Sequence, residues 1–518
     1  MDGNKREFEN FTEKHELIRG LGLPSLFAIG YADVGADIYI ALGVTALYAA
    51  GGTPLVFLIG SILYTCIGLA YAELASTYPY AGGASVYAMM AINDLAGFLA
   101  GWMVMLDYVI DIALFSVAAA GYLGFIHPWL IESRIQLPMN ISISMIGIVS
   151  ILIIIALIAI NYIGIKPSAL FTSMLVALNL VVLTSVIAVS FLTSWSYSNF
   201  ISNLCDIGSE FFEDEVSYTG LLNPKIEDLL YGLTLAMSSF IGIESIAQAA
   251  EEAKNPRRDI PRASALSVIM VVASVLSCSV LGLGVLGWRG LAEAQFNPIA
   301  AIAEKIPVIG DYIAVLVAIV AFAVTVASTN TGVIGVSRLV FSMGKFLVLP
   351  KWFYQVHPKY RTPTRSILLF SLIAIAIVVL GSLQPNILVF ISSLYNFGAL
   401  LSYVIVLLSL IILRNIDRSA CKPYKVPGAV KLRINGRAIE LPLIGAIGVI
   451  GVLIMWLLVV IYHAAARVLG FLWIITGLIV YSIYRRKIKL KVMAKFGREL
   501  MGVKIMNNPA PNSISGSR

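Results

Sequence analysis

Five acidic residues lie inside segments that are otherwise apolar and about long enough to cross a membrane. They are Asp33 and Asp37 in LPSLFAIGYADVGADIYIALGV, Asp107 and Asp111 in MLDYVIDIALF, and Glu244 in LTLAMSSFIGIESIAQ. Ionisable residues within a spanning segment are rare, costly and functional by default. The chemistry of this chain is therefore expected where these carboxyl groups meet.

The acids come in pairs, and basic residues are missing beside them. Asp107 and Asp111 are four residues apart, which places both on one helical face with Cβ atoms about 6 Å apart. Like charges that close in a low dielectric cannot both stay ionised without a compensating cation. The nearest intramembrane base is Arg338. The pattern predicts that a cation fills this role: a proton, Na⁺, K⁺ or a cationic organic substrate.

Glycines and hydroxyl-bearing residues accompany the acids. Gly30, Gly35 and Gly242 weaken a helix and are expected to supply unwound backbone at the site. A later apolar segment carries three hydroxyls at mid-depth, on Ser328, Thr329 and Thr331. Hydroxyls are hard oxygen ligands suited to Na⁺ or K⁺, but Ser and Thr also hydrogen-bond to their own helix. Both interpretations of these three residues stay open here.

The composition identifies the elements that must position these residues. The chain has 518 residues, of which 59% are hydrophobic and 13% charged, against about 25% charged residues in soluble domains. Apolar runs of spanning length predict an all-α polytopic membrane protein with twelve helices. These are expected at about 24–48, 54–78, 97–123, 141–161, 168–193, 229–250, 264–287, 312–342, 366–383, 386–412, 442–462 and 466–484.

The distribution of charge predicts the topology. Lys and Arg exceed acids, 36 against 29, but they gather in loops and in the tail, where the positive-inside rule explains them without a nucleic-acid partner. The loop from Trp195 to Asp228 is acidic and is expected outside. We predict a cytoplasmic N-terminal segment over 1–22, a ten-helix core over 23–415, helices eleven and twelve within 416–484, and a basic cytoplasmic tail over 485–518.

Enzymatic and metal functions find no support in the sequence. The four cysteines are scattered, with no CxxC pair and no histidine at metal-ligand spacing. There is no HExxH, GxSxG or P-loop motif. No catalytic residue, metal site or cofactor is therefore predicted, and the expected partners are the lipid bilayer and a small molecule or ion.

Two segments interrupt their own helical pattern. One is the opening stretch with Asp33 and Asp37, and the other is the stretch in which Ser238, Ser239 and Gly242 precede Glu244. They belong to helices one and six, five helices apart. Paired interruptions at corresponding positions of two halves are the best sequence pointer to an inverted-repeat transporter with its site at the midplane.

At this point the chain resembles the amino acid–polyamine–organocation (APC) superfamily of secondary transporters. The most specific match is SFIGIESIAQAAEEAKNPRRDIPRA from Ser239, followed by YAELASTYPYAGGASVYA from Tyr71 and the motifs between Gly335 and Pro363. The resemblance implies the LeuT-type 5+5 inverted repeat, broken helices one and six, and alternating access in the plasma membrane. It also implies that Glu244 acts as a coupling or gating acid, and that Glu73 is the recurring acid that closes helix two.

Departures from the superfamily pattern bear on the substrate. Relatives that carry amino acids usually have G-x-G-I-F in helix one, with glycine amides that bind the substrate carboxylate. Here the second glycine is Asp37, which would repel a carboxylate. A helix-five lysine of some proton-coupled relatives falls on Asn179. The combination of Asp33 with Asp107 and Tyr108 also resembles the potassium-uptake (KUP-type) branch.

The sequence therefore predicts a transporter of amino acids or polyamines, with a cationic substrate and coupling to H⁺ or Na⁺. In this prediction Asp33, Asp37 and Asp107 contact the cation, and Asp111 is a second-layer or proton-relay partner. The first alternative is H⁺-coupled K⁺ uptake. An alternative of another class is a membrane sensor that binds the solute without moving it.

Overall fold

The computed structural model describes residues 20–137, 141–163, 166–208, 219–358, 360, 362–383, 386–434 and 437–501. The chain before residue 20 and the tail beyond residue 501, which were predicted to be cytoplasmic, lie outside these residues. Within the described chain, twelve helices are long and apolar enough to cross a membrane. The prediction of a predominantly helical, twelve-helix membrane protein is therefore confirmed.

The membrane-spanning elements follow one another in the predicted order. They are α2 with α3 (Leu23–Gly35, Ile38–Ala49), α4 (Thr53–Thr77), α6 (Asp94–Ile126), α8 (Met145–Ile163), α9 (Lys166–Thr193), α11 with α12 (Pro224–Ala236, Glu244–Gln248), α13 (Pro256–Val285), α16 (Gly310–Lys345), α17 (Thr364–Ser382), α18 (Ile387–Ile416), α19 (Leu443–Tyr462) and α20 (Ala464–Lys487).

Shorter elements connect these helices. They are α5 (Gly83–Ala91), α7 (Trp129–Glu132), α10 (Tyr197–Leu204), α14 (Gly287–Glu293), α15 (Pro298–Glu304), α21 (Phe496–Leu500) and the 3₁₀ turns η3 (Met237–Phe240), η4 (Ala250–Glu252) and η5 (Lys351–Tyr354). Two antiparallel hairpins add to the expected all-α fold: β1 (Arg134–Leu137) with β2 (Ile141–Ser144), and β3 (Ala429–Ile434) with β4 (Arg437–Pro442).

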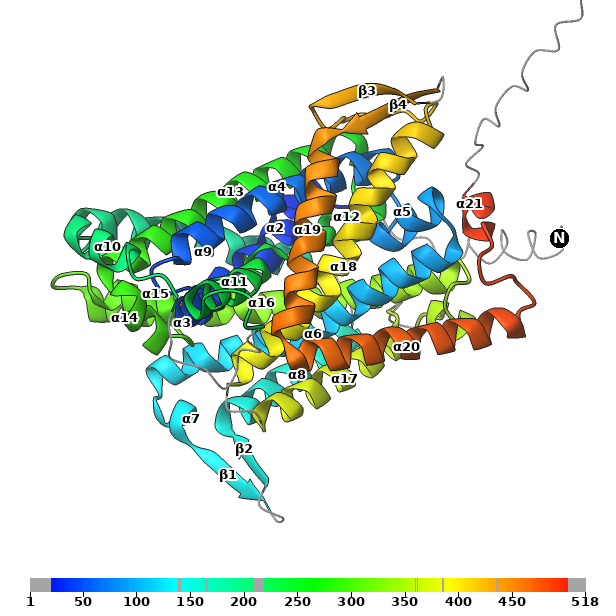
Figure 1. The fold of residues 1–518 in the computed structure, drawn as a ribbon. Helices are drawn as coiled ribbons and strands as arrows, with labels where there is room; N and C mark the ends of the chain where they lie inside the picture. The colour runs from blue at the N-terminus through cyan, green and yellow to red at the C-terminus, as the bar shows by residue number, and fades with distance from the viewer. Residues whose placement is uncertain are drawn as a thin grey trace, which may run out of the picture.

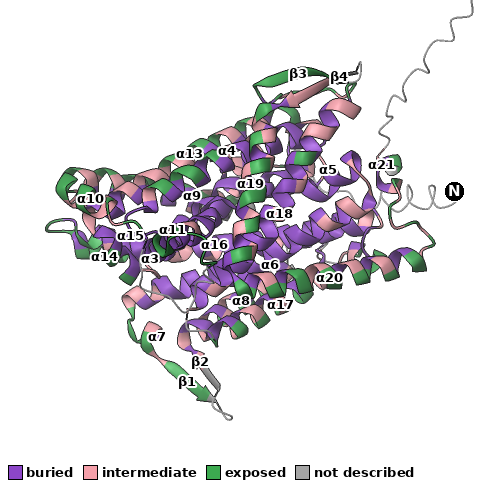
Figure 2. Ribbon diagram, viewed as in Figure 1, coloured by how far each residue is buried: buried purple, intermediate pink, exposed green. Residues whose placement is uncertain are grey.

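The helices form a bundle in which the elements with the interrupted patterns lie inside. Figure 1 shows α10, α14 and α15 at one end of the bundle, with α5, α21 and the β3–β4 hairpin toward the other. Figure 2 shows α6 and α18 largely buried, whereas α19 and α20 carry exposed residues along their length. The exposed residues on α19 and α20 include Ile447, Ile450 and Leu472. Such apolar outer faces are those that meet lipid.

Helices one and six are both interrupted, but to different degrees. Helix one turns at Ala36 and Asp37, which keep right-handed helical dihedral angles, and the Asp37 amide bonds to the Val34 carbonyl at 3.2 Å. Helix six tightens into η3 and then opens, with Ile241 extended and Gly242 at φ +120°. Only glycine adopts that last conformation readily, so helix six unwinds where helix one only kinks.

Several helix ends differ from the predicted ones, and each difference moves a charged residue. Helix six begins at Pro224, so Glu227 and Asp228, predicted in the outer loop, are buried in the first turns of α11. Helix ten runs to Ile416, so Arg414, predicted in a loop, is buried on α18. Helix twelve continues to Lys487 and buries Arg485. A hydropathy pattern misses such residues because it contains no information about the partner that stabilises a buried charge.

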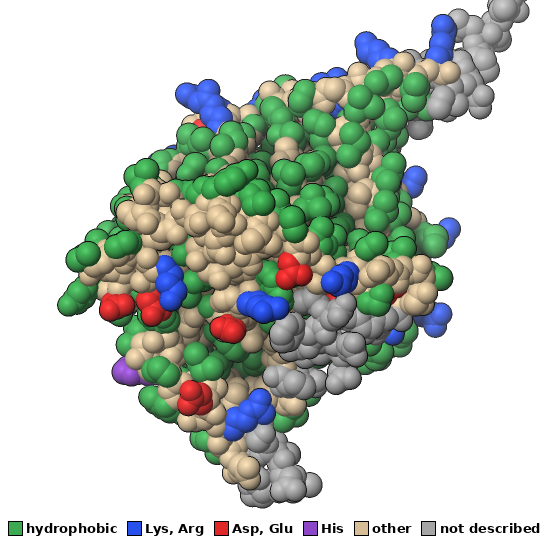
Figure 3. All heavy atoms as spheres, turned by 60° about the vertical axis from the view of Figure 1, so that its left-hand side comes forward, with side chains coloured by type: hydrophobic (Ala, Val, Ile, Leu, Met, Phe, Trp, Pro, Cys, Tyr) green, Lys and Arg blue, Asp and Glu red, His purple; other side chains and the backbone are tan. Residues whose placement is uncertain are grey.

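The two ends of the bundle carry different sets of charges. Figure 3 brings the end with α10 and α14 forward and shows acidic and basic side chains there between larger apolar areas. The opposite end carries the basic residues Lys254, Arg257, Arg258, Lys345, Lys351, Arg365, Arg418, Lys422, Lys425 and Lys431. This division follows the pattern on which the predicted orientation rests.

Candidate functional site

The five acids singled out from the sequence lie together in the interior of the bundle. Asp33 lies in the last turn of α2 and Asp37 at the start of α3, Asp107 and Asp111 lie on α6, and Glu244 begins α12. Each is at most 2% exposed. Elements far apart in the chain thus bring five carboxyl groups to one buried region.

The unwound part of helix six brings its backbone against Asp33. A Cβ at Gly242 would lie 2.8 Å from Asp33 Cγ, so only glycine fits here. Ser245 Oγ donates a hydrogen bond to Asp33 Oδ2, and Tyr108 Oη lies 3.4 Å from Ser245 Oγ. Ser328 of α16 lies beside the same carboxyl group. Helices one, three, six and eight therefore meet at Asp33.

Glu244 is held by a tyrosine of helix ten. Tyr403 Oη donates to Glu244 Oε2 at 2.6 Å, and the Gly242 amide donates to Tyr403 Oη at 3.1 Å. The Asp107 carboxyl group lies beside that of Glu244. Tyr403 thus links the unwound backbone to the acid that follows it.

Asp111 faces helices eight and ten. Tyr395 Oη donates to Asp111 Oδ1 at 3.2 Å. A Cβ at Gly332 would lie 2.4 Å from Asp111 Oδ2, so the absence of a side chain there makes room for this oxygen. Asp111 is therefore positioned by one hydrogen bond and one close backbone approach.

All five acids leave one oxygen without a hydrogen-bond partner among the described residues. These oxygens are Asp33 Oδ1, Asp37 Oδ2, Asp107 Oδ1, Asp111 Oδ2 and Glu244 Oε1. In this part of the chain, no Lys, Arg or His forms an ion pair with any of the five. A buried acceptor without a donor is costly, so the site suits a ligand that brings positive charge or donors.

The protein-family model described as amino acid permease matches residues 21–484. The chain belongs to the amino acid permease family. The permease is thus a multi-pass membrane transporter for a small molecule and not an enzyme.

Curated relatives agree with this assignment. The permease is 24% identical over 484 residues to the branched-chain amino acid permease of Bacillus subtilis, covering 91% of this chain and 94% of that one. It is 29% identical over 392 residues to an uncharacterised transporter of Mycobacterium tuberculosis, covering 75% and 79% of the two chains. It is also 26% identical over 367 residues to the chloroplastic cationic amino acid transporter 9 of Arabidopsis thaliana, covering 67% and 59%.

The glycines of helix one do not supply unwound backbone, contrary to the expectation. Gly30 and Gly35 both lie within α2. A Cβ at Gly30 would lie 2.4 Å from Ile246 Cδ1, and one at Gly35 would lie 2.7 Å from the ring of Tyr31. Their small size admits neighbouring side chains, and Gly242 alone of the three provides an opened backbone.

The hydroxyls of helix eight separate into two kinds. Ser328 Oγ is buried with no hydrogen-bond partner among the described residues and belongs to the acid cluster by position. Thr329 Oγ1 donates to the Thr325 carbonyl at 2.9 Å, and Thr331 Oγ1 to the Ala327 carbonyl at 3.1 Å. The permease thus presents Ser328 to the site, while the other two hydroxyls bond to their own helix.

Glu73 lies apart from the cluster. Arg414 Nε donates to Glu73 Oε1 at 2.8 Å, Arg414 Nη2 donates to Glu73 Oε2, and the Val426 amide donates to that oxygen at 2.7 Å. Both side chains are nearly fully buried. Glu73 thus has a cationic partner, which none of the five central acids has among the described residues.

Sequence reasoning missed the site residues of helix ten and one glycine of helix eight. Tyr395 and Tyr403 are eight residues apart, close to two helical turns, and this spacing in an apolar helix could have indicated a shared face. Gly332 follows the Ser–Thr run but carries no signal that it faces an acid. Ser245 follows Glu244 directly and could have been included with it.

Proposed function

We propose that the permease transports a cationic amino acid or a polyamine by alternating access, coupled to H⁺ or Na⁺. The observation that carries this proposal is the group of five buried carboxyl groups, each with an unpartnered oxygen and none with a cationic partner among the described residues. A cationic substrate supplies both the charge and the N–H donors that these oxygens accept.

Asp37 supports the choice of a cationic group as the recognised part of the substrate. Asp37 is the N-cap residue that directly precedes α3, at the end of the helix where the dipole favours a negative charge. A substrate carboxylate would compete with Asp37 for that position. The relatives named as cationic amino acid transporters support the same class, whereas the relative named as a branched-chain permease favours a neutral substrate.

In this proposal, each of the site residues has a separate role in binding or coupling. Asp33, Asp37 and Asp107 contact the transported cation, and Asp111 relays a proton behind them. Glu244, which accepts a hydrogen bond from Tyr403, either binds the coupling proton or gates access to the site. Of the three hydroxyls on helix eight, Ser328 binds the ion, while Thr329 and Thr331 stay bonded to their own helix. Glu73, paired with Arg414, holds the end of helix two.

The fold and orientation complete the proposal. Helices one and six would occupy equivalent places in a LeuT-type 5+5 inverted repeat over 23–415, so that their breaks open alternately to the two sides. Both termini would be cytoplasmic, in the plasma membrane, because the end rich in Lys and Arg stays inside.

Uptake into proteoliposomes tests the proposal directly. The substrates are labelled lysine, arginine, putrescine and alanine, with rubidium as a stand-in for K⁺. We expect saturable uptake of lysine, arginine or putrescine, and a 10- to 100-fold lower kcat/KM in Asp37→Asn and Asp107→Asn, since a hydrogen bond to a charged group contributes about 1.5–3 kcal/mol. Asp311→Asn, an exposed acid in the first turn of α16, is the matched control.

The oxygen-rich donor set also fits K⁺, and this favours H⁺-coupled potassium uptake as the second candidate. Rubidium uptake that is lost in both Asp variants, without amine uptake, would replace the first proposal with this one. Alanine uptake that persists unchanged in both variants would refute a cationic site. Ligand binding without uptake of any substrate would favour a sensor.

A further inference from the structure

A basic pocket lies at the end of the bundle where helix ten meets the β3–β4 hairpin. It has a volume of about 460 Å³, within the range of roughly 300–1,000 Å³ of small-molecule sites. Its charged lining residues are Arg414, Arg418, Lys422, Lys425, Lys431 and Glu440. Five basic side chains and one carboxylate line this cavity, so the lining stays positive even though Arg414 also pairs with Glu73 outside it.

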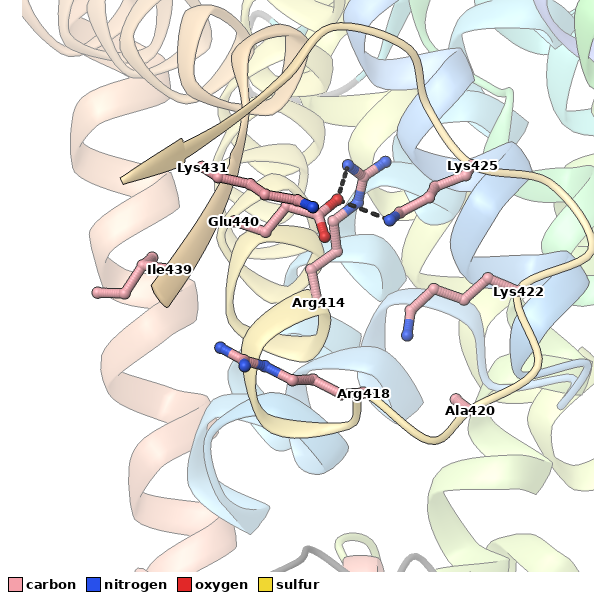
Figure 4. Close-up of a pocket in the computed structure, with 8 residues that line it drawn as sticks. All are labelled: Arg414, Arg418, Ala420, Lys422, Lys425, Lys431, Ile439 and Glu440. Atoms are coloured by element: carbon pink, nitrogen blue, oxygen red, sulfur yellow. Dashed lines mark hydrogen bonds and ion pairs between the residues drawn. The ribbon is translucent and has the colours of Figure 1, made fainter. Parts of the chain in front are cut away.

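The structure holds the framework of the pocket in place. Arg414, nearly fully buried at its inner side, bonds to Glu440 Oε1 at 3.1 Å, and Lys425 Nζ lies 2.8 Å from the same oxygen. Lys431 lies opposite Glu440 in the hairpin register. Figure 4 shows Lys425 and Lys431 reaching toward Glu440 from the loop and from the hairpin. The single carboxylate of the lining is therefore already engaged.

Lys422 lies in the same lining and is held there through a backbone group. Lys422 Nζ donates to the Asp417 backbone carbonyl at 2.7 Å, a neutral group. Burial lowers the pKa of Lys422 below its ordinary value, although nearby carboxylates oppose this shift. A bound anion would favour the charged form of this lysine.

We propose that this pocket binds a phosphate-bearing anion. Lys and Arg at several angles around one cavity match the several oxygens of a phosphate group. Two sources share this chemistry: the headgroup of an anionic lipid and a soluble phosphate compound.

The hairpin gives a reason to include the lipid source. Val430 and Leu432 alternate with Lys431 along β3, and both are 40% exposed. Leu443 and Ile447, at the start of α19, are also exposed apolar residues. An apolar strand face beside a basic pocket matches the depth of lipid headgroups, where acyl chains and phosphates meet.

Binding to the purified full-length protein tests this site independently of transport. One arm measures pyrophosphate binding by calorimetry in neutral detergent. The other counts phosphatidylglycerol retained in native mass spectrometry, with phosphatidylcholine as the reference lipid. We expect at least tenfold weaker binding of the recognised anion in Lys422→Gln/Lys431→Gln. The control Lys254→Gln/Lys351→Gln removes two exposed lysines from the same end and should bind like wild type.

Lysine acetylation of the wild-type protein covers the case of a double variant that does not fold. The recognised anion should slow acetylation of Lys422 and Lys431 at least threefold and leave Lys254 and Lys351 unchanged. Lipid retention alone would identify a headgroup site, and pyrophosphate binding alone a soluble ligand; either supports the proposal. Absence of binding in both arms, equal binding of the double variant, or equal protection of all four lysines would overturn it.

Discussion

Two regions of the permease hold acidic residues that differ in what faces their carboxyl groups. In the middle of the bundle, Asp33, Asp111 and Glu244 accept hydrogen bonds from a serine or a tyrosine. All five central acids keep an oxygen without a partner among the described residues. Toward the end with α5 and α21, three acids each face an arginine. These pairs are Glu73 with Arg414, Asp94 with Arg485, and Glu252 with Arg338.

The difference shows that burial alone does not mark a functional acid. Asp94 and Arg485 are both fully buried, with Asp94 Oδ2 at 2.7 Å from Arg485 Nη2, and the amides of Phe496 and Gly497 also donate to Asp94. Such a pair is complete and holds helix three, helix twelve and α21 together. An acid cluster without a paired cationic side chain can instead bind a ligand, which is the property that a transport site needs.

The largest effect is expected where the open cluster is neutralised. Asp33→Asn/Asp107→Asn removes two of the three proposed cation contacts, so we expect kcat/KM for the cationic substrate to fall by more than 100-fold in proteoliposomes. The temperature of unfolding should stay the same or rise, because two unpaired buried acids become neutral. Unchanged uptake with a lower unfolding temperature would instead make these acids structural.

A loss of stability without a loss of transport is expected when the ion pair of Asp94 and Arg485 is broken. Arg485→Gln leaves Asp94 buried without its cation, which should lower the free energy of unfolding by about 3–5 kcal/mol. Denaturation in detergent, followed by tryptophan fluorescence, measures this loss. The folded fraction should keep the wild-type KM. Asp94→Asn/Arg485→Gln should recover part of the stability, and a double variant less stable than Arg485→Gln would contradict the ion-pair explanation.

The sequence was sufficient for the helices and for the central acids. Apolar runs of spanning length are easy to recognise because few backbone structures can cross a lipid bilayer. Asp33 and Asp107 are easy to recognise within them because charged residues are rare in such segments. Even the break in helix six was readable, because Gly242 is the residue that the opened backbone requires. These features depend on composition and local conformation, which the sequence displays directly.

The partners of the acids could not be predicted in the same way. Asp94 and Arg485 are 391 residues apart, and the sequence places Arg485 at the start of a basic tail. Arg414 likewise looks like a residue of a basic loop in the sequence, although α18 extends far enough to bury it against Glu73. The β3–β4 hairpin was also missed, since its alternation of Val430, Lys431 and Leu432 is too short to stand out in a charged loop. Pairing over such distances follows from the fold, and no local pattern records it.

A smaller difference is expected within helix eight. Ser328 presents an unpartnered hydroxyl to Asp33, whereas the Thr329 hydroxyl bonds to its own helix. Ser328→Ala should therefore raise the coupling-ion concentration needed for half-maximal uptake about 5- to 10-fold, since a hydrogen bond contributes about 1 kcal/mol. Thr329→Ala is the matched control and should change it less than twofold. Equal effects of the two variants would assign the ion site to the whole Ser–Thr run.

The smallest effect concerns a buried base that, like the central acids, has no charged partner in an ion pair among the described residues. His463, between α19 and α20, lies 2.6 Å from Thr234 Oγ1 through Nε2 and packs on Tyr231. Burial lowers the pKa of His463 from 6.5 to about 3.

The unfolded chain therefore takes up a proton as the pH falls below about 6.5, while the folded permease does not. Its stability contribution is complete above pH 6.5 and is lost toward pH 3, by up to about 1.4 kcal/mol per pH unit. His463→Gln should narrow the difference in unfolding temperature between pH 7.5 and pH 5.5. If that difference persists in His463→Gln, the acid sensitivity arises from the central carboxyl groups or from another group, and the neutral state of His463 is not what the low pH disturbs.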